Sequence, residues 1–142
     1  TYYIDHGDIV VSRDETNTMV QQGTNGPVVD NETITITQSN STVATDNTIT
    51  VDSSVTDGQI VLDNVNIAAE NAAAMDVQGS ASVELSGGHS LAGGKGGDEF
   101  FENDGNIHIS SGEITAIGGE GPAGIGGGNH KNGGNITIGG NR

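Results

Sequence analysis

The sequence predicts an all-β fold, and more narrowly a right-handed parallel β-helix, a three-faced solenoid of about five coils. Short segments with apolar residues two apart recur along the chain, and runs of glycine fall between them. Hydrophobic residues make up only 32% of the 142 residues, with 24 Gly and no Trp. A thin column of Ile, Val and Leu suits that composition better than a bulky globular core does.

Five segments show the strand pattern most clearly. Each places an apolar pair on one face, as a half-buried strand requires, and they are 33–37, 59–63, 82–86, 106–110 and 135–139. Their first apolar residues are Ile34, Ile60, Val83, Ile107 and Ile136, at intervals of 26, 23, 24 and 29 residues. Internal periods of this size indicate stacked repeats.

Two further apolar segments follow each of these strands, so that one coil would contain three short strands. The second segments hold Val43, then Val65 with Ile67, Leu91, and Ile114 with Ile117. The third hold Ile49 with Val51, Met75 with Val77, Phe100 with Phe101, and Ile125. Asn106 and Asn135 precede equivalent strands, and they are either members of a side-chain ladder or ordinary turn residues.

The chain divides into two parts by this pattern. Residues 1–32 fit the repeat poorly and are expected to form N-terminal cap strands, with strand-like stretches at Asp8–Ser12 and Pro27–Asp30. Residues 33–142 form the repeats. The chain has no initiating Met and stops just after Asn135–Ile138, so we expect a piece of a longer repeat protein.

The charge balance excludes several classes of partner. Nineteen acidic residues face four basic ones, a net charge of -15. Binding to nucleic acid or to an anionic membrane surface depends on Lys and Arg, and this field would repel both. No apolar run approaches the roughly 18 residues that span a bilayer, so no membrane insertion is expected.

The Gly-rich half resembles a known group of repeats. Residues 118–128 read GGEGPAGIGGG and residues 133–138 read GGNITI. They resemble the GGxGxAGIGGG…GGxITI repeats of large secreted and surface proteins of Gram-positive bacteria. Residues 60–67 (IVLDNVNI) and 83–87 (VELSG) resemble rungs of the same group.

This resemblance covers about residues 33–140 and implies a parallel β-helix in a secreted or cell-surface protein. Members are often labelled carbohydrate-binding or adhesin-like, and some resemble calcium-dependent pectin-binding β-helices. The chain departs from the pattern at 97–104, where GDEFFEND replaces a turn of small residues.

That departure suggests Ca²⁺, the one cofactor that the sequence leaves open. Gly93–Phe101 matches the calcium-binding nonapeptide G-G-x-G-x-D-x-U-x, but one copy supplies only half a site. A looser site of clustered carboxylates is the alternative, with the candidate ligands Asp98, Glu99, Glu102 and Asp104. A solvated acidic loop explains the same residues without any metal.

Catalytic and transition-metal chemistry have little support. The four histidines are not at zinc-binding spacing, and the chain has no cysteine. No Ser-His-Asp or Gly-x-Ser-x-Gly arrangement is visible, and no carboxylates flank a basic residue on one strand face. We therefore expect a protein that is not an enzyme.

Two functions remain open. The first is an adhesin or stalk scaffold of a larger bacterial surface protein, able to associate end to end with other copies. The second is a carbohydrate-binding module for an acidic polysaccharide, assisted by calcium. Its candidate ligand-binding residues are the polar outward positions of the first strand of each coil, namely Thr35, Glu84, His108 and Thr137, with Val61 between them. Few aromatic residues are available to stack on a sugar.

Overall fold

The computed structural model describes residues 1–69 and 74–86, apart from the side chain of Leu85, and the backbone of six later strands. Those strands are 90–92, 101–103, 106–109, 115–117, 125–126 and 135–138. The described chain is built from sixteen strands, and its one helical element is the short 3-10 helix η1 (Ile4–His6). The predicted all-β class is confirmed.

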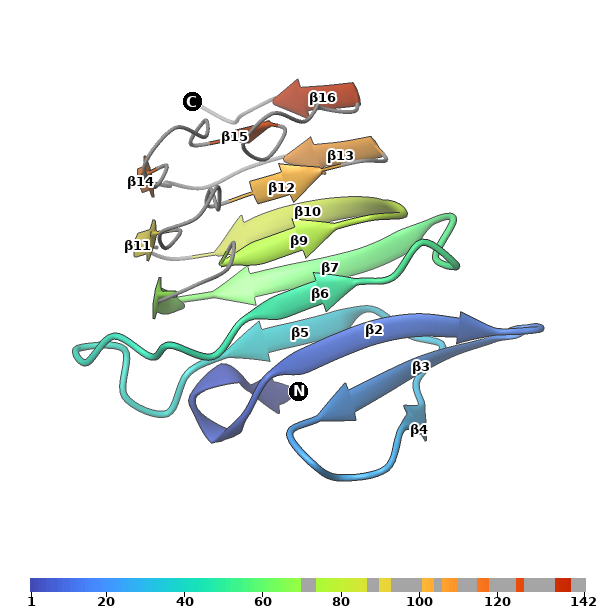
Figure 1. Cartoon of the computed structure of the whole chain (residues 1–142), viewed down its shortest axis with the longest axis horizontal. Coiled ribbons are helices and arrows are strands. Elements are labelled where there is room, and N and C mark those ends of the chain that lie inside the picture. Colours follow the sequence, from blue (N-terminus) through green and yellow to red (C-terminus); the bar gives the residue numbers. More distant parts are fainter. Residues whose placement is uncertain are drawn as a thin grey trace.

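The strands form three sheets, seen from the side in Figure 1. Sheet A contains, in spatial order, β1 (Tyr2–Tyr3), β5 (Ile34–Thr37), β7 (Gly58–Asp63), β10 (Ser80–Ser86), β13 (Asn106–Ile109) and β16 (Asn135–Ile138). Sheet B contains β15 (Ile125–Gly126), β12 (Phe101–Asn103), β9 (Met75–Val77), β6 (Ile49–Val51), β2 (Ile9–Asp14), β3 (Asn17–Gln22) and β4 (Val28–Val29). Sheet C contains β14 (Thr115–Ile117), β11 (Ser90–Ala92) and β8 (Asn66–Ala68).

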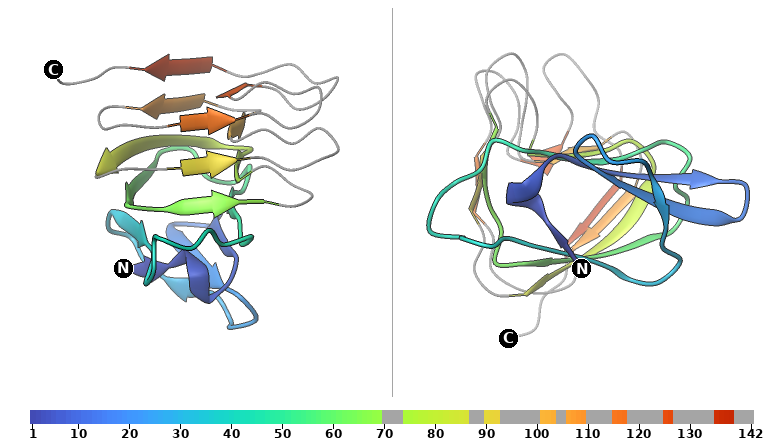
Figure 2. Two further views of the ribbon diagram at one scale, coloured as in Figure 1. Left: turned by 90° about the vertical axis from the view of Figure 1, so that its left-hand side faces the viewer. Right: turned by 90° about the horizontal axis from the view of Figure 1, so that it is seen from below.

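From β5 onward, neighbouring strands of a sheet are far apart in the sequence, because the chain alternates between the sheets. From β7 to β16 the order is sheet A, sheet C, sheet B, repeated. The strands of each new round lie beside those of the round before (Figure 2). Within the described strands every pair is parallel except β2–β3 and β3–β4. Parallel pairs need a crossover connection, and from β7 onward each crossover carries strands of the other two sheets.

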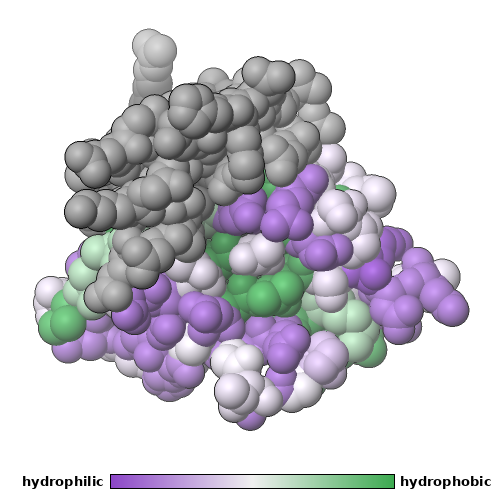
Figure 3. All heavy atoms as spheres, viewed as in Figure 1, coloured by the Kyte–Doolittle hydropathy of each residue, from purple (hydrophilic) through white to green (hydrophobic). Residues whose placement is uncertain are grey.

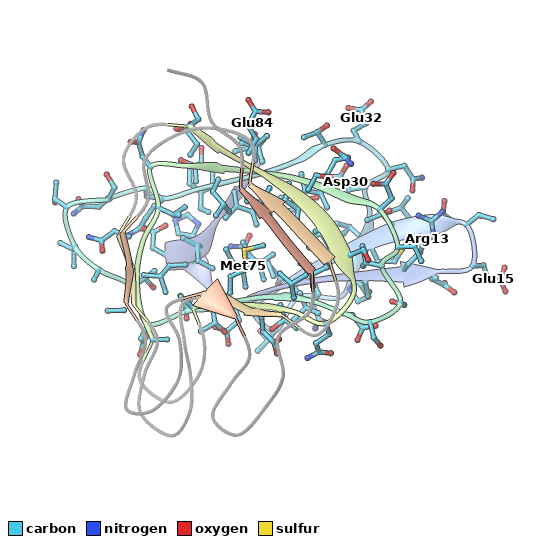
Figure 4. All side chains as sticks on the ribbon, turned by 90° about the horizontal axis from the view of Figure 1, so that it is seen from above. Arg13, Glu15, Asp30, Glu32, Met75 and Glu84 are labelled. Atoms are coloured by element: carbon cyan, nitrogen blue, oxygen red, sulfur yellow. The ribbon has the colours of Figure 1, made fainter. Side chains whose placement is uncertain are left out.

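The interior is filled by apolar residues that lie in register from strand to strand. In sheet A, Ile34 pairs with Ile60 and Ile60 with Val83, and each is at most 1% exposed. Sheet B contributes a matching column, whose member Met75 lies in the middle of the molecule when it is viewed from above (Figure 4). Ile67 of sheet C completes one continuous hydrophobic cluster.

The register of β13 differs from the one that the sequence pattern predicts. Matching the first apolar residues aligns Val83 with Ile107. In the structure Val83 pairs with Ile109, and Ile107 pairs with Ala81. A shift of two residues leaves every side chain on its original face, since side chains alternate along a strand. The hydrophobic pattern therefore cannot distinguish the two alignments.

The first strands belong to the same ladders as the later ones. β1 pairs in parallel with β5, and β2 pairs in parallel with β6. β3 and β4 then extend sheet B by antiparallel pairing. The 3-10 helix between β1 and β2 buries Ile4 completely against the core. The division at residue 32 and the capping role of residues 1–32 stay predictions.

The predicted strand around Val43 is absent from the structure. Val43 is 61% exposed, and this loop pairs with sheet C through a single isolated bridge, from Thr45 to Ile67. The buried side chain of Gln38 takes the place of a strand here. Its Nε2 donates to the carbonyl oxygens of Asn40 and Val43, and its Oε1 accepts the Asn66 N–H at 2.8 Å. The other second and third segments have residues on strands as predicted, on β8, β11 and β14 and on β6, β9, β12 and β15. Val65 is buried just before β8, and Ile114 and Phe100 lie outside the described residues.

Candidate functional site

The structure places the predicted ligand-binding residues on sheet A, but in two ladders. Thr35 pairs with Val61, and Val61 pairs with Glu84, as the sequence pattern predicts. His108 pairs with Ser82, and not with Glu84 as the pattern predicts. Thr137 pairs with His108 and so follows it into this second ladder. The two-residue shift of β13 causes this separation.

The side chains of His108 and Thr137 lie outside the described residues, and their backbone positions alone are known. The same holds for the Asn ladder: Asn106 and Asn135 are in register on neighbouring strands. Whether their amides bond to one another stays a prediction.

Most of the predicted calcium loop lies outside the described residues. Asp98, Glu99 and Asp104 lie outside the described residues, and Glu102 is placed only by its backbone on β12, opposite Asp76 of β9. In the described part of the chain, no group of three or more His, Asp or Glu side chains is arranged to hold a metal ion. Calcium binding by this loop stays a prediction.

A groove runs over the side of sheet A, and it includes residues that the sequence pattern did not single out. It consists of two depressions, of about 260 and 520 Å³, which share Thr33 and Gln59 in their walls. The smaller one is also lined by Ile60, Val61, Ser82, Val83 and Glu84, and the larger one by Thr18, Asn31, Glu32, Ile34, Asp57 and Gly58. We call the two together the sheet A groove. Figure 4 shows Glu84 and Glu32 pointing outward on the same side of the molecule.

Hydrogen bonds hold part of this lining in place. The side-chain oxygen of Asn31 accepts the Thr18 N–H at 2.8 Å, and its amide nitrogen donates to Asn17. Gln59 donates from Nε2 to the carboxylate of Asp57 at 3.0 Å. These contacts fix the positions of amide groups that a hydroxyl-rich ligand could also use.

The charged side chains of the groove are all acidic among the described residues. In the described part of the chain, its lining contains three carboxylates, from Glu32, Asp57 and Glu84, and no Lys, Arg or His. Arg13, on β2, is the one Lys or Arg in the part of the chain described with side chains. Charges within about 8–10 Å of one another still interact at physiological salt. The described part of the groove therefore repels anions and attracts cations.

A further cavity lies beside the loop that follows β5. It has a volume of about 580 Å³ and is lined by Asp5, Asn40, Val43, Ala44, Thr45, Asp46 and Ala68. The Asp5 carboxylate accepts the N–H groups of Ser39 and Asn40 at 3.0 and 3.2 Å. Partial burial acts to raise the pKa of Asp5, but these backbone donors outweigh it and lower the pKa below its usual value. The carboxylate is thereby a structural acceptor for this loop.

The same loop brings together a Ser–His pair that the sequence does not reveal. Ser39 Oγ lies 2.9 Å from His6 Nε2, and the His6 ring stacks on Tyr3 with centroids 5.3 Å apart. Acyl transfer would also need N–H donors for the developing oxyanion. The adjacent N–H groups, of Ser39 and Asn40, already donate to Asp5. This geometry favours a structural role, and no spacing signal could have found the pair, because its members are 33 residues apart.

Comparisons with protein-family models, with curated proteins and with solved structures returned no match for this chain. Among the described residues, no helix is both long and apolar enough to cross a membrane.

Proposed function

We propose that this chain is a non-catalytic module of a larger bacterial surface protein, in which a right-handed parallel β-helix acts as a stalk or adhesin scaffold. The observation that supports the proposal is the order in which the chain visits sheets A, C and B, with parallel pairing in register from round to round. In such a stack each round contacts only its neighbours, and the backbone hydrogen bonds run along the stacking direction.

A continuous ladder of this kind is mechanically suited to a spacer. Rounds are separated by the interstrand distance of about 4.8 Å, so length grows in proportion to the number of repeats. The resemblance of residues 118–138 to repeats of Gram-positive surface proteins supports the extracellular location. The low content of basic residues keeps the surface free of nucleic-acid or anionic-membrane affinity.

The absence of cysteine allows a direct test. Spin labels on Thr35→Cys and Thr137→Cys would report the separation of β5 and β16, which lie four strand spacings apart in sheet A. We expect one narrow distance distribution, centred near roughly 20 Å for the backbone positions. A broad distribution, or one centred well beyond that distance, would contradict a rigid stack.

Polysaccharide binding is the second candidate function, and the sheet A groove is the observation that favours it. The form expected from the sequence is an acidic polysaccharide bridged by calcium. A thermal melt with and without millimolar Ca²⁺, repeated with polygalacturonate, tests this form, because a ligand that binds only the native state raises Tm. A rise that requires both additions would support it, and an unchanged Tm would leave the stalk function alone.

A further inference from the structure

The sheet A groove offers hydrogen-bonding groups to an elongated ligand. It is lined by Thr33, which directly precedes β5, by Gln59 on β7 and by Ser82 on β10. Towards β3 the lining continues with Thr18 and Asn31. Gln59 and Ser82 are in register on β7 and β10, so their side chains follow one another at the strand spacing. A polymer lying across the strands would meet a hydroxyl or an amide at each of these steps.

Two carboxylates of this groove are not engaged within the described part of the chain. Neither the Glu32 nor the Glu84 carboxylate has a hydrogen-bond or ion-pair partner there. The third carboxylate, of Asp57, accepts from Gln59. Because the described lining contains no basic side chain, an anionic sugar would have to bind against repulsion from all three.

We infer that the sheet A groove takes a polysaccharide that carries free amino groups, of the glucosamine-polymer type, and not an acidic one. The inference rests on the proposed polysaccharide binding and names the class of sugar. The ligand's hydroxyl groups bond to Thr33, Gln59 and Ser82, and its ammonium groups pair with Glu84, Glu32 and Asp57. Ionic pairing replaces the aromatic stacking on which many sugar sites depend, since the described residues of the lining include no aromatic one.

The test compares three oligosaccharides of equal length by calorimetric titration of the full chain: a glucosamine hexamer, its fully N-acetylated form and a galacturonate hexamer. We expect binding of the glucosamine hexamer at pH 6, where its amino groups are largely protonated. N-acetylation removes the charge while retaining the sugar ring, and it should weaken binding at least tenfold. The galacturonate hexamer should not bind, with or without Ca²⁺.

Variants locate the site. The double substitution Glu32→Gln and Glu84→Gln should weaken glucosamine-hexamer binding by roughly four- to twentyfold, since an exposed ion pair contributes about two- to fivefold. Glu15→Gln is the control, because Glu15 is exposed, lies between β2 and β3 outside the groove lining, and carries the same charge. It should change binding by less than about twofold.

The other possible results of these titrations lead to different conclusions. Equal binding of the acetylated hexamer, sensitive to the double substitution, would overturn the charge class and leave glycan binding intact. Binding of the galacturonate hexamer in the presence of Ca²⁺ would overturn the inference and show that the groove takes an acidic polysaccharide. An equal effect of Glu15→Gln, or equal binding of an oligolysine of matched charge, would show general attraction of cations and overturn the site. Absence of binding to all three sugars would overturn this inference and glycan binding together.

Discussion

The first round of the chain and the rounds that follow it are held together in different ways. Up to residue 48, polar side chains supplement the strand ladders by connecting η1 to loops: Asp5 accepts the Ser39 N–H at 3.0 Å, and Asn47 donates to the Ile4 carbonyl oxygen at 3.0 Å. From β6 to β10 the connections are backbone ladders over matched apolar columns.

The two regions should therefore be destabilised by different substitutions. A ladder repeats the same contact many times, so the loss of one contact matters little. It is sensitive to substitution where two rounds lie so close that no side chain fits between them. A loop held by a few side chains depends on each of them, and on their protonation. On the face shown in Figure 3, hydrophilic residues cover much of the described part, and hydrophobic ones gather near its middle.

The largest effect is expected at Gly79, in the turn between β9 and β10. A Cβ there would lie 2.3 Å from the Val55 carbonyl oxygen and 2.6 Å from that of Asp52. Backbone must move to admit it, so Gly79→Ala should lower the free energy of unfolding by about 3 kcal/mol, measured by urea denaturation. Gly26→Ala is the matched control, because a Cβ at Gly26 meets nothing within 4 Å. Equal losses in the two variants would mean that the rounds do not approach closely at Gly79.

The next largest effect is expected at Gln38, which connects the loop of the first round to β8. Gln38→Ala leaves the Asn66 N–H and the Val43 carbonyl oxygen without their present partner. Loss of the buried bonds should cost about 2 kcal/mol. Gln59→Ala removes the same side chain from an exposed position and should cost less than about 0.5 kcal/mol. If the two substitutions cost the same, polar side chains do not hold the first round.

A smaller effect is expected at Tyr2, whose hydroxyl donates to Asp30 Oδ2 at 2.7 Å. Tyr2→Phe should cost about 1 kcal/mol. Burial, together with the hydrogen bond and the negative charge of Asp30, raises the pKa of Tyr2 from 10.0 to about 12. The folded state thus holds this proton more tightly than the unfolded state does, and stability falls as pH rises between these two values.

Absorbance titration of the Tyr3→Phe variant checks this shift, because Tyr2 is then the only tyrosine in the chain. Ionisation near pH 10 would show that Tyr2 is not in contact with Asp30.

The smallest effect is expected on acidification. Backbone N–H donors lower the pKa of Asp5, and the Ser54 N–H and hydroxyl lower that of Asp52, both from 3.8. A depressed pKa contributes stability that is present above the unfolded value and is lost as pH falls through the folded one. The stability difference between the native chain and the double variant Asp5→Asn, Asp52→Asn should therefore shrink below pH 3.8, followed by urea denaturation at each pH. A difference that is constant down to pH 2 would contradict these assignments.

Much of the fold could be predicted from local pattern. The alternation in 33–37, 59–63 and 82–86 identifies β5, β7 and β10, and the apolar positions Ile34, Ile60 and Val83 are all buried. The loop at Val43 could not be predicted in this way, because a single apolar residue does not distinguish a strand from an exposed loop. Nor could the antiparallel pairing of β3, since alternation says nothing about the direction of a neighbouring strand.

The candidate site was predictable only in part. Thr35 and Glu84 lie on the expected face and in the expected ladder through Val61. Glu32 and Asp57 line the groove from loops next to strands, where no periodic pattern applies. Ser39 and His6 meet because β1 pairs in parallel with β5, and Asp5 then bonds η1 to the loop after β5.

The sequence by itself determined which residues of each strand face the interior, because alternation has a period of two and apolar side chains must leave water. It also determined the acidic character of the surface. Only the tertiary structure decided which residues lie opposite one another. A slip of two residues preserves every inward position, so the choice between Ile107 and Ile109 as the partner of Val83 depends on how whole rounds pack. That choice places His108 beside Ser82 and not beside Glu84.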